Sequence, residues 1–240
     1  MAKVEELPPT YGRFMWSLTR YLLRTGEHEH LPLDRFRMVV LLFARPELPL
    51  SKEEIIPSLP YYHVRSGRAV NFYCAGYKTG VGFPDDVLIA QVGGYDCFFS
   101  TERFNTARTE ITAHSTWEYS GGCDLILVNA GLRMTSDWPP QPKAYLDFST
   151  AISVNLEKMK AEQAIDSVAG FFERIIKFTE SYDGSDPTWG FSDAEAKTLA
   201  GSALKSVVLS LVPKPIREHI KQAFHFAVRD IHARSTADEV

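Results

Sequence analysis

The sequence predicts an α/β fold built on a mixed β-sheet. In the first half of the chain, short apolar runs rich in Val, Leu and Ile alternate with polar segments, which is typical of strands covered by helices. After about residue 157 the apolar residues recur with the period of 3.6 that indicates helices. We therefore expect an N-terminal helix, a sheet that starts with a βαβ unit and a hairpin, and a C-terminal three-helix set packed on the sheet.

The first elements of this fold are a helix and the βαβ unit. Apolar residues recur at helical spacing over residues 11–25. The continuous apolar run 37–44 is typical of a central strand that is buried on both faces. A capping box at Ser51–Glu54 predicts a helix, and the prolines that follow it should keep that helix short. The run 69–77 then predicts a second strand, parallel to the first.

The middle of the chain predicts a hairpin, a helix and two longer strands. Residues 87–100 form the hairpin, because Gly93–Gly94 suits the positive φ angles of a two-residue turn. Residues 101–114 are polar with a thin apolar stripe, which indicates a surface helix. The run 124–132 predicts another strand, and the strict alternation over 145–156 predicts a strand with one face on the core.

Three helices are expected at the C-terminal end. The helical period over residues 157–182 predicts the first, and a second capping box at Ser192–Glu195 predicts the start of the next. The third helix is expected to have an apolar face formed by residues spaced from Ile216 to Ile231. We therefore divide the chain into a sheet domain with its N-terminal helix, 1–156, and a helical segment on the same core, 157–240.

Composition excludes several classes of protein. The chain has 240 residues, is 45% hydrophobic and carries a net charge of -4, so it is a globular chain rather than a disordered one. This charge predicts no nucleic-acid partner. No apolar run approaches the length of about 20 residues that crosses a bilayer, so we expect no membrane partner and a cytoplasmic protein. The three cysteines show no metal-ligand spacing and suit buried thiols.

Two groups of residues are candidates for binding an anion such as a phosphate. Arg65 and Arg68 flank a Ser-Gly turn, where two guanidinium groups can hold a phosphate or a carboxylate; a solvated turn is the competing interpretation. Ligands of open α/β sheets bind at the C-terminal ends of the strands. The residues expected at that edge are Arg45, Tyr77, Lys78 and Asn129.

The acidic residues Asp85, Asp86 and Glu110 are the candidates for catalysis. Carboxylates that flank central strands can hold Mg²⁺ for the hydrolysis of a phosphoester. The sequence contains neither a complete phosphate-binding loop nor a nucleophile elbow. We therefore expect no cofactor, except for a divalent metal ion in the hydrolase hypothesis.

The leading hypothesis is an interaction or regulatory protein without catalysis of its own. The segment Tyr61–Arg65 is aromatic and basic, which favours contact with a protein partner. Two alternatives act on a phosphate-containing small molecule: a metal-assisted hydrolase with Asp85, Asp86 and Glu110, and a sensor that binds its ligand at the strand ends.

Overall fold

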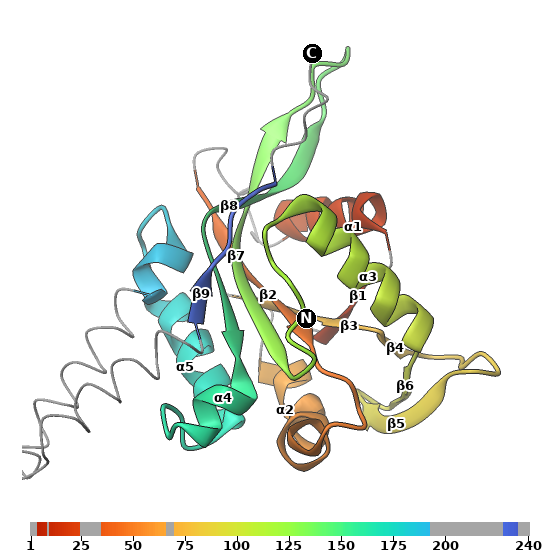
Figure 1. Cartoon of the computed structure of the whole chain (residues 1–240). Helices are drawn as coiled ribbons and strands as arrows, with labels where there is room; N and C mark the ends of the chain where they lie inside the picture. Colours follow the sequence, from red (N-terminus) through yellow and green to blue (C-terminus); the bar gives the residue numbers. More distant parts are fainter. Residues whose placement is uncertain (1–3, 9, 25–34, 66–69, 193–227, 235–240) are drawn as a thin grey trace, which may run out of the picture.

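A six-stranded mixed sheet with helices on both faces forms the body of the protein, and a small three-stranded sheet lies beside it (Figure 1). The computed structural model describes residues 4–8, 10–24, 35–65, 70–192 and 228–234. The predicted mixed α/β class is confirmed. Within the described part of the chain, no helix is long and apolar enough to span a membrane.

The large sheet combines parallel and antiparallel pairs. β3 pairs in parallel with β1 and with β2, whereas β7, β8 and β9 add on the far side of β2 in antiparallel fashion. The strand order is β1-β3-β2-β7-β8-β9. These strands span β1 (Val4–Leu7), β2 (Arg37–Phe43), β3 (Asn71–Ala75), β7 (Asp124–Met134), β8 (Pro142–Asn155) and β9 (Val228–Asp230).

Helices cover both faces of this sheet. Phe72 of β3 packs against Tyr62 of α2 and Phe172 of α5. The next side chain, Tyr73, contacts Phe14 of α1 on the opposite face, because successive side chains of a strand alternate. The helices span α1 (Tyr11–Arg24), α2 (Ile56–Arg65), α3 (Thr101–His114), α4 (Leu156–Ala161) and α5 (Val168–Ser181), with a π-helical turn at Ser51–Ile55 before α2.

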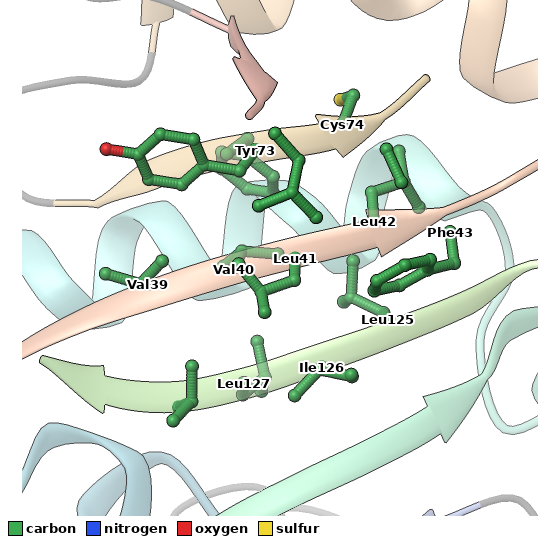
Figure 2. Close-up of a cluster of buried hydrophobic side chains, with 14 of the residues drawn as sticks. Val39, Val40, Leu41, Leu42, Phe43, Tyr73, Cys74, Leu125, Ile126 and Leu127 are labelled. Carbon is green, nitrogen blue, oxygen red and sulfur yellow. The ribbon is translucent and has the colours of Figure 1, made fainter. Parts of the chain in front are cut away.

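β2 lies at the centre of the core. Residues 38–44 are all buried, as predicted for a strand covered on both faces. Figure 2 shows β2 between β3 and β7, with the side chains of Val39, Val40 and Leu41 packed among those of the neighbouring strands. A strand of this kind can bury nearly every side chain only because helices lie above and below it.

The second predicted strand, 69–77, is wrong in one respect: the chain leaves the large sheet at Gly76. The φ angle of Gly76 is +78°, and a Cβ there would lie 2.8 Å from the Cβ of Phe104, so the bend requires glycine. The chain then enters the small antiparallel sheet, whose order is β4-β6-β5. Its strands are β4 (Tyr77–Thr79), β5 (Val87–Val92) and β6 (Tyr95–Phe99). The predicted hairpin turn at Gly93–Gly94 joins β5 to β6 with positive φ angles.

The predicted capping box at Ser51–Glu54 is wrong. Leu50 occupies the N-cap without a side-chain hydrogen bond, and the Ser51 hydroxyl contacts the sulfur of Cys123 at 3.3 Å. Glu54 instead pairs with Lys160 and accepts a hydrogen bond from the Val168 backbone N–H at 2.7 Å. The helix also continues through Pro60 to Arg65, because the packing of α2 on the sheet outweighs the lost hydrogen bond.

Three predictions for the C-terminal end are wrong. The expected helix 157–182 is two helices, and the chain breaks between them near Gln163, whose φ is +57°. Ser192 lies inside a helical stretch, residues 187–192, instead of capping one. Residues 228–230 pair with β8 as strand β9, so the apolar residue Ile231 does not end a helix. Most of the second and third expected helices falls in residues 193–227, outside the described residues.

Candidate functional site

The small sheet contains a buried ion pair between two of the candidate residues. Lys78 of β4 and Asp86, from the loop before β5, lie with Nζ 2.7 Å from Oδ2, and their side chains are only 5% and 4% exposed. The sequence suggested Lys78 as a ligand-binding residue and Asp86 as a catalytic acid. The structure brings the two together as each other's partner.

This ion pair pins the loop of residues 80–86 onto one face of the small sheet. The strand register places Lys78, Phe98 and Leu88 in a row across β4, β6 and β5. The Phe83 ring lies over the Lys78 ammonium, 3.9 Å from Nζ to the ring centroid. Gly82 lies against Phe98 so closely that a Cβ would come within 2.7 Å of that ring. The loop therefore has one defined position on this face.

Asp86 is held in its charged form. Burial by itself raises the pKa of this carboxyl, but the hydrogen bonds from Lys78 and from the Phe83 backbone N–H outweigh burial and lower the pKa below its ordinary value. The Phe83 N–H donates to Asp86 Oδ2 at 2.7 Å. The same carboxylate thus neutralises Lys78 and fixes the backbone of the loop.

Four apolar side chains of this region lie in water. Phe83 and Val81 of the pinned loop are 62% and 88% exposed. Val87 and Leu88, which begin β5, are 59% and 58% exposed. β5 is the last strand of its sheet and contains no charged residue or proline, two usual protections of an edge strand, although α2 packs against part of it. Leu88 shares the face on which the loop lies, whereas Val87 pairs with Phe99 and points to the other face of β5. We call Val81, Phe83 and Leu88 the loop–edge patch.

Arg45 and Tyr77 follow strands of the large sheet, at one end of it. The Arg45 guanidinium pairs with Glu47 at 2.5 Å. The Tyr77 hydroxyl is buried and donates to the carbonyl oxygen of Ala44 at 2.7 Å, and burial raises its pKa well above the ordinary value. The Tyr77 hydroxyl thus forms a hydrogen bond within the fold.

Asn129 takes part in a buried polar network. Its amide nitrogen donates to Thr150 Oγ1 at 3.1 Å and to Asp186 Oδ1 at 2.6 Å. Its oxygen accepts from the backbone and the hydroxyl of Thr188, at 3.1 and 2.7 Å. Because β7 runs antiparallel to β2, Asn129 pairs with Met38, at the opposite end of β2 from Arg45. The fold therefore places the candidates Asn129 and Arg45 far from each other along β2.

The remaining anion-binding candidates lie on or beside α2. Arg65 forms a two-pronged ion pair with Glu180 and lies 3.5 Å from Glu173, both on α5. Tyr61 donates to Glu173 at 2.6 Å. Tyr61 and Arg65 thus contact α5, while Tyr61 remains 50% and Val64 79% exposed. Arg68 falls outside the described residues.

The three carboxylates of the hydrolase hypothesis have separate surroundings. Asp85 is exposed, Asp86 pairs with Lys78, and Glu110 accepts a hydrogen bond from the Tyr11 backbone N–H at 3.1 Å. In the part of the chain that the structure describes, no three His, Cys, Asp or Glu side chains form a group that could hold a metal ion.

The exposed apolar side chains of the loop before β5 were not singled out by the sequence analysis. The available signal was Val81 and Phe83, two large apolar residues in a loop where polar residues are the rule. Comparison of the chain with protein-family models, with curated proteins and with solved structures gave no match.

Proposed function

We propose that this chain is a binding protein that acts through a protein partner docked on the loop–edge patch. The observation that carries this proposal is the pinned loop: a buried ion pair fixes residues 80–86 in a position that leaves Val81 and Phe83 in water. A loop serving only to connect β4 and β5 needs neither the ion pair nor the apolar residues.

The energetics support a role outside folding. A buried ion pair contributes little net stability, because the cost of removing both charges from water offsets their attraction. Each exposed side chain of the patch also forgoes the roughly 1.5–3 kcal/mol that full burial of such a residue supplies. A partner that covers Phe83 and Leu88 would recover that energy on binding, and a fixed loop would reduce the entropy lost.

Charge around the patch favours a particular kind of partner. Asp85 precedes β5 and is exposed, and Asp96 of β6 lies opposite Gln91 of β5 and is also exposed. An apolar centre with carboxylates beside it is complementary to a protein surface with apolar side chains and flanking Lys or Arg. No contact among the described residues favours the hydrolase or the sensor in the same way.

Photo-crosslinking in the native cell tests this proposal. A benzoylphenylalanine at position 83 should give a discrete adduct of higher mass. The matched control is the same group at Trp189, another exposed aromatic residue on a different element, which should not give that adduct. Leu88→Asp in the position-83 chain should abolish the adduct.

Two results would overturn the proposal. One is the absence of an adduct from position 83, or the same adducts from positions 83 and 189. The other is an adduct made only of two copies of this chain, which would replace a separate partner by self-association.

A further inference from the structure

The β7–β8 hairpin forms an arm that extends beyond the other elements (Figure 1). The two strands pair from Asp124 and Asn155 at one end to Met134 and Pro142 at the other. At the tip of the arm, Trp138 is 92% exposed, more than any other large apolar side chain of the described residues. Exposing an indole to this extent has no benefit for folding.

The tip of the arm is rich in proline. Pro139, Pro140 and Pro142 have no N–H to donate. The Thr135 N–H donates to the carbonyl of Gln141 at 2.9 Å, and the Gln141 N–H donates to the Thr135 hydroxyl at 3.1 Å. The tip therefore has fewer backbone N–H groups to desolvate than a turn of the same length without proline.

Two cations lie opposite each other just below the tip. Arg133 of β7 and Lys143 of β8 are direct cross-strand partners, and both are exposed. Like charges in this position destabilise a hairpin. Among the residues that the structure describes, neither forms a salt bridge, although the Arg133 guanidinium lies over the Tyr145 ring, with its carbon 5.6 Å from the ring centroid. An anion brought by a partner would relieve this repulsion.

We propose that the arm binds the surface of an anionic lipid membrane. Trp138 enters the interface between headgroups and acyl chains, where tryptophan is favoured, and Arg133 and Lys143 contact lipid phosphates. Along the arm, the cations lie roughly 10 Å below the tip at strand spacing, which matches the depth of that interface. This inference departs from the expectation of no membrane partner.

A membrane fits the arm better than a protein surface does. The tip presents one large apolar side chain, Trp138, whereas each partner of a stable protein interface buries roughly 800 Å². A lipid surface needs no complementary shape, and it supplies the anions and the polarity gradient together. The arm and the loop–edge patch belong to different sheets, so this inference does not depend on the proposed function.

Vesicle co-sedimentation of the full chain tests the inference. Vesicles of phosphatidylcholine with 30% phosphatidylserine are the probe, and vesicles of phosphatidylcholine alone are the lipid control. We expect binding only to the anionic vesicles, weakened about tenfold by Trp138→Ala and about tenfold by Arg133→Glu with Lys143→Glu. Asp137→Asn should strengthen binding, because it removes the carboxylate beside Trp138.

Matched controls separate the arm from unspecific effects. Trp189→Ala removes another exposed tryptophan, and Lys158→Glu reverses another exposed cation; neither should change binding. Each variant is first checked for an unchanged thermal midpoint. Absence of binding, equal binding to both kinds of vesicle, or equal loss in Trp138→Ala and Trp189→Ala would overturn the inference. Binding of the arm to poly-glutamate but not to vesicles would also overturn it, in favour of an acidic protein.

Discussion

The ammonium group of Lys78 lies between a carboxylate and an aromatic ring, and each neighbour compensates part of its lost hydration. Asp86 supplies the opposite charge at 2.7 Å, and the face of Phe83 lies 3.9 Å from Nζ. Lys78 thus connects the buried side chain of Asp86 to Phe83, an exposed residue that we propose contacts the partner. Substitutions of Lys78 or Asp86 are therefore expected to lower both the stability of the protein and its affinity for the partner.

Removal of the Asp86 charge should destabilise the protein. Asp86→Asn leaves Lys78 buried without its counter-charge, and we expect a loss of about 2 kcal/mol in the free energy of unfolding. Urea unfolding measures this loss. The control is Asp85→Asn, an exposed neighbour that should change stability by less than about 0.5 kcal/mol. Equal effects of the two variants would contradict the pairing.

The contribution of Asp86 should depend on pH in a defined direction. Its pKa is lowered in the folded protein, so its stabilising effect is complete above the ordinary aspartate value of about 4 and is lost as pH falls through the lowered pKa. The difference in unfolding free energy between wild type and Asp86→Asn should therefore be constant from pH 5 to 7 and shrink below pH 4. A difference that grows on acidification would refute this assignment.

At the scale of elements, Asn129 connects β7 to the helical stretch that follows α5. Its side chain bonds both Asp186 and Thr188, and Asp186 also caps that stretch by accepting from the Trp189 N–H at 2.9 Å. A single buried amide thus positions a chain segment about sixty residues further on, with no ligand required.

Truncation of this amide should loosen the contact between β7 and residues 186–192. Asn129→Ala leaves several buried groups without partners, so we expect a loss of about 3 kcal/mol in unfolding free energy. Relative to the wild type, this variant should show a larger increase in hydrogen exchange at the Thr188 and Trp189 amides than at those of β2. A variant as stable as the wild type would show that the network contributes little. Thr150→Val, which removes one member only, should cost less.

Elements with strong local signals were predictable from the sequence. The helix 101–114 was predicted with the bounds that α3 has, because polar residues surround one apolar stripe; in the structure Ser100 caps its start. The bend at Gly76 was not predictable, because it depends on the close approach of Phe104 from α3. Strand β9 was also missed: residues 228–230 are helical in pattern, but pairing with β8 decides their structure.

The candidate site shows the same limit. Sequence reasoning selected Lys78 and Asp86 individually, because charged residues near strand ends suggest chemistry. It could not pair them, because the contact forms only when residues 80–86 fold back over β4 and β6. The exposure of Phe83 is likewise a property of the folded loop.

At the scale of the whole molecule, the described residues form one continuous core, and two surface features expose large apolar side chains. The core is continuous across the large sheet, and it includes residues of α1, α2, α3 and α5 as well as the central strands. The loop–edge patch presents apolar side chains beside carboxylates, whereas the arm presents an indole above two cations. Their chemistry differs, so the two surfaces suit different partners.

The affinity of the partner captured at position 83 tests the central claim most directly. The purified partner is titrated by calorimetry into wild type, Phe83→Asp, Leu88→Asp and the exposed control Trp189→Asp. We predict a Kd at least tenfold weaker for both patch variants, equivalent to roughly 1.4 kcal/mol, and no change for the control. Equal affinities for all four chains would contradict the assignment of the loop–edge patch as the binding surface.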